Sequence, residues 1–182
     1  MNFLNDVGAK SSKFVNKGTL LGFFILFATV FSGTVQAAKP GDRVGDWFYN
    51  CDADSNAGKG ICYISQTLQK KQGTRQLRLM TANIGRLFKD KKIWLVTLLP
   101  LDAWRVDVQS PVTIDVDKKK SVAGKIDTCF VEACRARFVL NRKAVSSIMR
   151  GTAAGVSFKL ITGKPVRIEL SLKGITNALG NL

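Results

Sequence analysis

The stretch Val112-Thr113-Ile114-Asp115-Val116-Asp117 indicates the fold class of this 182-residue chain more clearly than any other. Its three aliphatic residues alternate with one threonine and two aspartates, which is the period of two of a β-strand with one buried face. The polar residues then face the solvent, as on an antiparallel sheet that is covered on one side only. The stretch therefore predicts a half-exposed β-strand.

Further β-rich runs lie on both sides of this stretch, and residues typical of turns separate them. The expected strands are residues 61–68, 76–82, 93–99, 112–117, 135–140, 156–161 and 166–172. In the second of these, the alternation places Leu77, Leu79 and Thr81 on one face and Arg78 on the other. The near-continuous apolar run at 93–99 indicates a strand that is buried on both faces or lies at the centre of a sandwich. Turns are expected at residues 58–60, 70–73, 89–92, 100, 118–120 and 162–165.

Only two stretches have helical spacing. Residues 142–150 place Val145, Ile148 and Met149 on one side before Gly151 ends the pattern, and residues 174–182 could form a closing helical turn. Many short strands with little helix predict an all-β fold, a single β-sandwich with one or two short helices. Residues 38–182 contain no linker, repeat or low-complexity tract, and we expect them to form one domain.

The first 37 residues have the pattern of an export signal. Lys10, Lys13 and Lys17 precede an uncharged apolar run at 18–31, and Ala37 stands at the expected cleavage position. The run has 14 residues, whereas a membrane-spanning helix needs about 20. We therefore expect cleavage near Ala37 and a mature protein in the periplasm, secreted or on the outer surface. An uncleaved inner-membrane anchor is the alternative.

The four cysteines, in an exported chain, predict two disulfides with three possible connectivities. Spacing favours the local pairs Cys51–Cys62 and Cys129–Cys134, because the second pair flanks four residues, the length of a hairpin loop. A zinc site built from the four cysteines is the less favoured alternative, since only the second pair has a suitable spacing.

The chain contains no histidine, which excludes Ser-His-Asp catalysis, imidazole metal ligands and a histidine pH switch.

The chain without its export segment is strongly basic. The whole chain has 28 Lys and Arg and 13 Asp and Glu, and the export segment contains three of the basic residues and one of the acidic ones. Residues 38–182 therefore have 25 basic and 12 acidic residues, a net charge of +13. Such a charge favours acidic proteins or anionic membrane and glycan surfaces as partners. Nucleic acid would suit the charge but not the compartment, and is not expected.

Basic residues gather at several places. Arg135 and Arg137 share one strand face, and Arg142 and Lys143 follow closely, so these four are the candidate anion-binding residues. Further clusters are Arg75 with Arg78, residues 85–92 and residues 118–120. An ordinary solvated surface is the alternative interpretation of all of them.

Two pairs of carboxylates and the three tryptophans are further candidates for functional groups. Asp115 and Asp117 could form a pair about 7 Å apart on one strand face, but a solvated strand face has the same pattern and lysines follow at once. Asp52 and Asp54 lack the spacing of a calcium loop. Trp47, Trp94 and Trp104 could stack on a ligand, but Trp47 is expected to pack over the Cys51 bridge. The exposure of Trp104 is left open. We therefore predict no catalytic residue, metal site or cofactor.

Several short motifs follow one another in a characteristic order along residues 41–180. They are Gly45-Asp46-Trp47, Cys51, Cys62, Ser65-Gln66, Pro100, Val112 to Asp117, Cys129-x₄-Cys134, Arg150-Gly151, Ser171-Leu172-Lys173-Gly174-Ile175 and Ala178-Leu179. In this order they resemble the invasion-associated locus B family of exported bacterial proteins. The resemblance implies a single immunoglobulin-like β-sandwich in the envelope and, in some pathogens, a part in host-cell entry. It implies no catalytic residues.

These observations favour a non-enzymatic exported protein that works by binding. Two alternatives remain open. One is a periplasmic envelope-integrity factor that binds anionic lipid or glycan, and the other is an envelope hydrolase that uses carboxylates or Ser-Lys chemistry.

Overall fold

The computed structural model describes residues 38–52, 61–86, 92–119 and 122–182, which belong to one compact unit. The predicted export signal at residues 1–37 lies outside the described residues. Within the described part, ten strands and two short helices make up the fold, and every strand pair is antiparallel. The predicted all-β class is confirmed.

The strands form one continuous sheet in the order β1-β2-β3-β4-β5-β8-β7-β6-β9-β10. Their bounds are β1 Arg43–Val44, β2 Trp47–Asp52, β3 Ile61–Gln72, β4 Arg75–Arg86, β5 Ile93–Pro100, β6 Val112–Val116, β7 Val122–Cys129, β8 Ala133–Leu140, β9 Ala153–Lys159 and β10 Pro165–Ser171. The helices are α1 Arg142–Arg150 and α2 Ile175–Gly180. Helix α1 has the predicted bounds, and α2 lies within the predicted closing segment.

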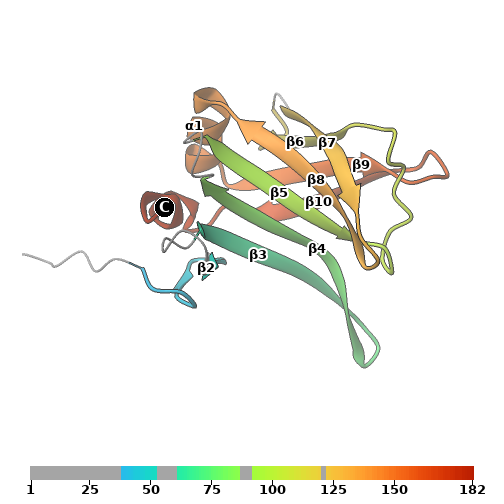
Figure 1. The fold of residues 1–182 in the computed structure, drawn as a ribbon, viewed down its shortest axis with the longest axis horizontal. Coiled ribbons are helices and arrows are strands. Elements are labelled where there is room, and N and C mark those ends of the chain that lie inside the picture. Colours follow the sequence, from blue (N-terminus) through green and yellow to red (C-terminus); the bar gives the residue numbers. More distant parts are fainter. Residues whose placement is uncertain (1–37, 53–60, 87–91, 120–121) are drawn as a thin grey trace, which may run out of the picture. The chain divides into compact units, whose positions relative to one another are not determined.

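Strand β7 joins two layers because it changes neighbours along its length. Val122 and Gly124 pair with β6, whereas Lys125 and the residues after it pair with β8. One layer contains β1 to β5 and β8, and the other contains β6, β9 and β10. Figure 1 shows β9 and β10 crossing behind β5 and β8. The hydrophobic core lies between the layers.

Alternation along the strands fills this core. Leu95 and Phe138 from one layer and Val156 and Leu170 from the other are almost completely buried in one hydrophobic cluster. In β6 the alternation is as predicted, with Val112 and Ile114 buried. In β4 it is not, because Met80, Ala82 and Ile84 are buried while Leu77 and Thr81 stay partly exposed.

The β3–β4 hairpin is longer than predicted. Residues 70–72 are the end of a twelve-residue strand and not part of the turn, which consists of Gly73 and Thr74. Only Thr81 to Arg86 of β4 pair with β5, so the far part of the hairpin projects beyond that neighbour (Figure 1).

The first and last motifs of the resemblance pack against each other. Asp46 accepts a hydrogen bond from the Ser171 hydroxyl at 2.6 Å, and its backbone N–H donates to the Lys173 carbonyl at 3.1 Å. Gly45 and Gly174 both have positive φ and lie so close that a Cβ on either would collide with backbone atoms of the other segment. Glycine is required at both positions for this approach.

Both disulfides join cross-strand neighbours. Cys51 pairs with Cys62 between β2 and β3, and Cys129 pairs with Cys134 at the end of the β7–β8 hairpin. The Cα–Cα distances are 4.0 Å and 3.9 Å. These are the two local pairs that the spacing favours.

Candidate functional site

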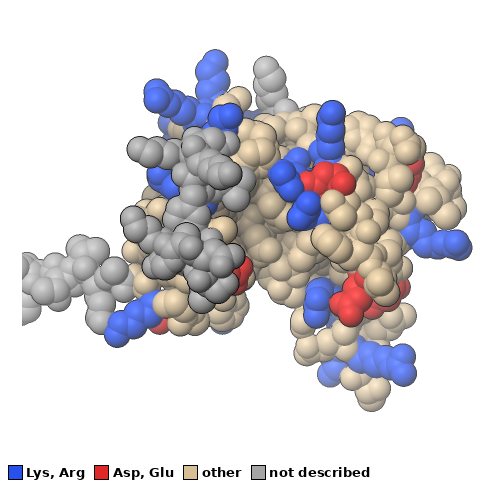
Figure 2. Space-filling view, in the orientation of Figure 1, with Lys and Arg blue, Asp and Glu red and all other residues tan. Residues whose placement is uncertain are grey.

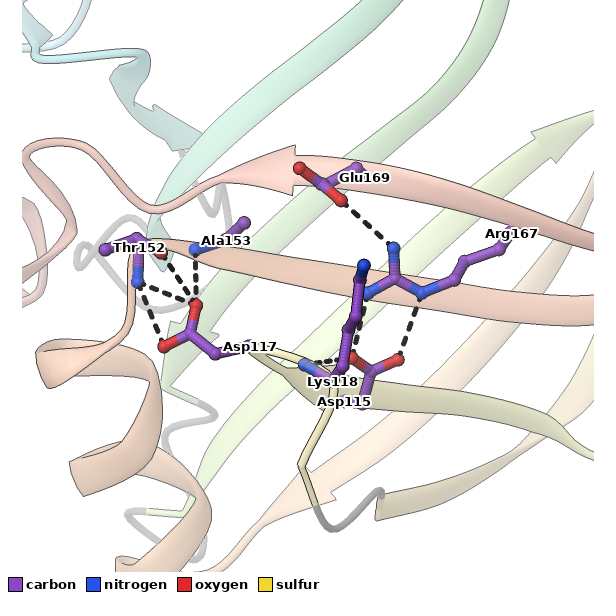
Figure 3. Close-up of polar contacts among 7 residues, drawn as sticks. All are labelled: Asp115, Asp117, Lys118, Thr152, Ala153, Arg167 and Glu169. Atoms are coloured by element: carbon purple, nitrogen blue, oxygen red, sulfur yellow. Dashed lines mark hydrogen bonds and ion pairs between the residues drawn. The ribbon is translucent and has the colours of Figure 1, made fainter.

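The two candidate carboxylates at the end of β6 are engaged by the protein itself (Figure 3). Asp115 forms an ion pair with Arg167 at 2.9 Å, and it also accepts from the Lys118 backbone N–H. Asp117 accepts from the N–H groups of Thr152 and Ala153 and from the Thr152 hydroxyl, all at 2.8–3.1 Å. The two groups therefore point to different partners and do not form an acid–base pair.

Asp117 also lies outside the strand on which it was predicted. Its φ of 49° is left-handed, and Lys118 follows with φ 59° in the same turn. Aspartate tolerates this conformation better than most residues, because its short polar side chain bonds locally. The hydrogen bonds from Thr152 and Ala153 lower the pKa of Asp117, so this group stays ionised and serves as an acceptor.

Arg135 and Arg137 do share one face of β8, and they also share one carboxylate. Asp127 pairs with Arg135 and with Arg137, each at 2.7 Å. The guanidinium groups lie over aromatic rings as well, Arg135 over Phe130 at 5.7 Å and Arg137 over Trp94 at 5.4 Å. Part of the positive charge expected for this face is thus neutralised.

A bulge in β7 explains why Asp127 reaches both arginines. The register with β8 shifts between Ile126 and Thr128, so Asp127 is the extra residue. A bulge of this kind re-aims a side chain relative to the regular pleat. Alternation alone does not reveal such a shift, so the pairing of Asp127 with both arginines could not be predicted from the sequence.

The cations of α1 are free of such partners. Arg142, Lys143 and Arg150 are exposed, and among the described residues none of them forms an ion pair or a side-chain hydrogen bond. Helix α1 contains no acidic residue. Figure 2 shows Lys and Arg side chains projecting from the end of the molecule where α1 lies.

The fold places α1 at the opposite end of β8 from Arg135. Asn141 follows β8 directly and caps the helix, its side-chain oxygen accepting from the Ala144 N–H at 2.9 Å. On its inner side α1 buries Ile148, which is 2% exposed. The four candidate anion-binding residues are therefore split into two places, and the structure does not unite them in one site.

Two apolar hollows flank α1. The first, of about 300 Å³, lies toward β6 and β7, and the second, of about 770 Å³, lies toward the start of β5. The second is lined by Lys92, Ile93, Leu140, Asn141, Arg142, Val145, Ser146, Met149 and Arg150. Sequence reasoning missed both hollows, because they arise where the helix crosses strand ends that are distant in the chain.

The tryptophans serve the core and its edges. Trp47 is fully buried and donates to the Ser171 carbonyl at 3.0 Å. Trp104 lies in the predicted connection but packs edge-on against Phe158 and donates to the Leu79 carbonyl. These contacts give Trp47 and Trp104 structural roles.

No group of three or more His, Cys, Asp or Glu side chains in the described part of the chain is suited to hold a metal ion. Nor does any helix in the described ranges have the length and apolar character needed to cross a bilayer.

Comparison with known proteins identifies the family. A model of the invasion associated locus B (IalB) protein family matches residues 47–182. The chain belongs to this family. The crystal structure of invasion associated protein B from Bartonella henselae is similar, with a TM-score of 0.65 and 21% identity over 76% of this chain and 91% of that one. At this identity the likeness shows a shared fold. No curated protein sequence matches the chain.

Proposed function

We propose that this member of the IalB family is an exported, non-catalytic binding protein whose α1 end attaches to an anionic membrane surface in or around the bacterial envelope. A contribution to host-cell contact is part of the proposal, because the relative from Bartonella henselae is described as invasion associated. The observation that carries the membrane attachment is the set of exposed α1 cations without partners in the described structure.

Charge supports the choice of partner. A net charge of +13 on residues 38–182 favours anionic surfaces. Arginine binds phosphate well because its planar group can donate two parallel hydrogen bonds. Of the candidate residues, Arg142 and Lys143 have no acidic partner among the described residues, whereas Arg135 and Arg137 share Asp127. We therefore place the contact at α1.

The structural role of the carboxylates Asp115 and Asp117 also favours binding over catalysis. Asp115 and Asp117 accept hydrogen bonds that hold the end of β6 to β9 and β10. The chain has no histidine to act as a general base. A hydrolase would need a different set of acidic and nucleophilic groups brought together in one pocket.

The test is the double substitution Arg142→Glu and Lys143→Glu in the full chain. Acidic residues in the first turn of a helix are favoured by the helix dipole, by about 0.3–1 kcal/mol, so the variant is expected to fold normally. Co-sedimentation with vesicles of anionic lipid should fall at least tenfold in affinity. Wild-type binding should weaken as salt rises, because the Debye length falls to about 3 Å at 1 M.

The matched control is Lys70→Glu with Lys71→Glu, which changes the net charge equally on the exposed β3–β4 hairpin. It should bind vesicles nearly as well as wild type at moderate salt. Equal loss in both variants would show a general effect of net charge and would overturn the assignment to α1. Undiminished binding by the α1 variant would overturn it as well.

A further inference from the structure

The hollow between α1 and β5 is lined by apolar as well as basic side chains, and electrostatic attachment alone does not require the apolar ones. Its floor is formed by Ile93 and Leu140, which are cross-strand partners in β5 and β8. Val145 and Met149 from α1 form the wall, and Met149 is 38% exposed although its side chain is apolar. The hollow is thus an apolar groove at the surface, about 770 Å³ in volume.

Helical spacing places an arginine at each end of this groove. Counted from Arg142, the side chains of Val145, Met149 and Arg150 follow at three, seven and eight positions. At helical spacing all four lie on one face of α1. At a rise of about 1.5 Å per residue, the two arginines are about 12 Å apart along the helix axis. No carboxylate lines the groove among the described residues.

Arg142 is placed at the better end for an anionic group. It is the first residue of a nine-residue helix, where free backbone N–H groups and the helix dipole attract negative charge. Arg150 stands at the other end, where its aliphatic stem can cover apolar atoms while its charged group stays in water.

We propose that the groove binds a single phospholipid of anionic character, with the phosphate at Arg142 and part of one acyl chain along Val145 and Met149. The proposal rests on the proposed function and names its ligand. A free phosphate or a glycan would match the arginines but leave the apolar floor and wall uncovered. An acyl chain with an anionic head matches both features, and burial of the chain supplies the main attraction.

The experiment titrates the full chain with alkyl phosphates of six, eight and ten carbons, each below the concentration at which it forms micelles. Affinity should rise about fourfold for each added methylene that enters the groove. The binding enthalpy should become more negative as the temperature rises, because burial of apolar surface gives a negative heat-capacity change. Inorganic phosphate should bind weakly.

A methionine label locates the binding. The chain has three methionines, of which Met80 is fully buried in the core and Met149 lies in the groove. With ¹³C-labelled methionine methyl groups, decyl phosphate should shift the Met149 signal and leave the Met80 signal in place. The variant Met149→Gln assigns the signal, and it should lower affinity for the long chain more than for the short one.

Two arginine variants test the orientation. Arg142→Gln should weaken binding of every alkyl phosphate about tenfold without changing the dependence on chain length. Arg150→Gln should have a smaller effect, and an equal or larger effect would overturn the placement of the phosphate.

Equal affinity for all chain lengths, or an unmoved Met149 signal, would overturn the lipid groove while leaving attachment to anionic vesicles intact. Failure of wild type to bind anionic vesicles would instead refute the proposed function. A response to acidic peptides but not to alkyl phosphates would replace the lipid by a protein partner, and so contradict the proposal.

Discussion

At the scale of single residues, Asp117 shows how a polar side chain that looks free in the sequence becomes part of the fold. It sits in a left-handed turn and holds the start of β9 through Thr152 and Ala153. The alternation correctly placed Asp115 outside the core, but it could not show that the chain turns directly after Val116. That turn is held by hydrogen bonds from Thr152 to Asp117, two residues that are 35 positions apart in the chain.

Asp117 should make stability depend on pH. Its pKa is lowered below the ordinary value of 3.8 by hydrogen bonds from Thr152 and Ala153, so folding favours the ionised form. The stabilisation is fully present above about pH 4 and is lost as the pH falls through the lowered pKa. Asp117→Asn keeps the left-handed turn but removes this dependence.

Urea unfolding at pH 7 and pH 3 measures the effect. Wild type should be more stable than Asp117→Asn at pH 7, and the difference should shrink at pH 3. The control is Asp102→Asn, since Asp102 has no hydrogen bond or ion pair in the described part of the chain. A difference between wild type and Asp117→Asn that is independent of pH would contradict the explanation.

At the scale of elements, the two disulfides each lock a hairpin neck. Replacing Cys129 and Cys134 together by alanine should cost about 2 kcal/mol of unfolding free energy, because the closed loop is only six residues long. Replacing Cys51 and Cys62 should cost slightly more, about 3 kcal/mol, for the longer loop. Denaturant unfolding of the two double variants measures both values.

Peptide mapping without reduction checks the connectivity itself. Each bridge should be found within one local fragment of the chain. A peptide that links the first half of the chain to the second would refute the pairing, and a loss much larger than 3 kcal/mol would show that the bridges do more than close their loops.

Most elements could be predicted from the sequence, and the exceptions have physical causes. Helix α1 was predicted with its bounds because its apolar residues have helical spacing and Gly151 ends the pattern. In β4 the inward face was not identified, since a register shift opposite Leu68 and Gln69 changes which residues face the core. Strands β1, β2 and β7 were not among the predicted strands, and in β7 the polar residues and the bulge obscure the alternation.

At the scale of the whole molecule, one buried glutamine joins the two layers. Gln66 in β3 is 4% exposed, and its amide donates to the carbonyls of Asp46 and Ser171 while accepting from the Ser171 N–H at 3.0 Å. These contacts satisfy backbone groups at the end of β10, which pairs with β9 along its other edge.

Gln66→Leu should therefore destabilise the protein by about 2–3 kcal/mol, because buried backbone groups lose their partners. Denaturant unfolding gives the value, and Gln72→Leu on the exposed hairpin serves as the matched control, with a change within about 0.5 kcal/mol. A loss no greater than that of the control would show that the hydrogen bonds of Gln66 do not help to hold the two layers together.

The alternation of apolar and polar residues was enough to predict an all-β fold, and cysteine spacing was enough to favour the two bridges. Both are local properties, because a strand's inward face and a hairpin's neck depend on residues close together in the chain. The family resemblance likewise rested on short motifs in a fixed order.

Contacts between distant segments could not be obtained this way. The pairing of Asp127 with both arginines, and the groove between α1 and β5, depend on how strands pack and where a bulge falls. For this reason the sequence treated four basic residues as one candidate site, whereas the folded chain neutralises two of them in part and leaves the α1 pair exposed to a partner. The sequence shows which side chains are charged, but only the tertiary structure shows which of them are already paired with an opposite charge, because that depends on neighbours that are distant in the chain.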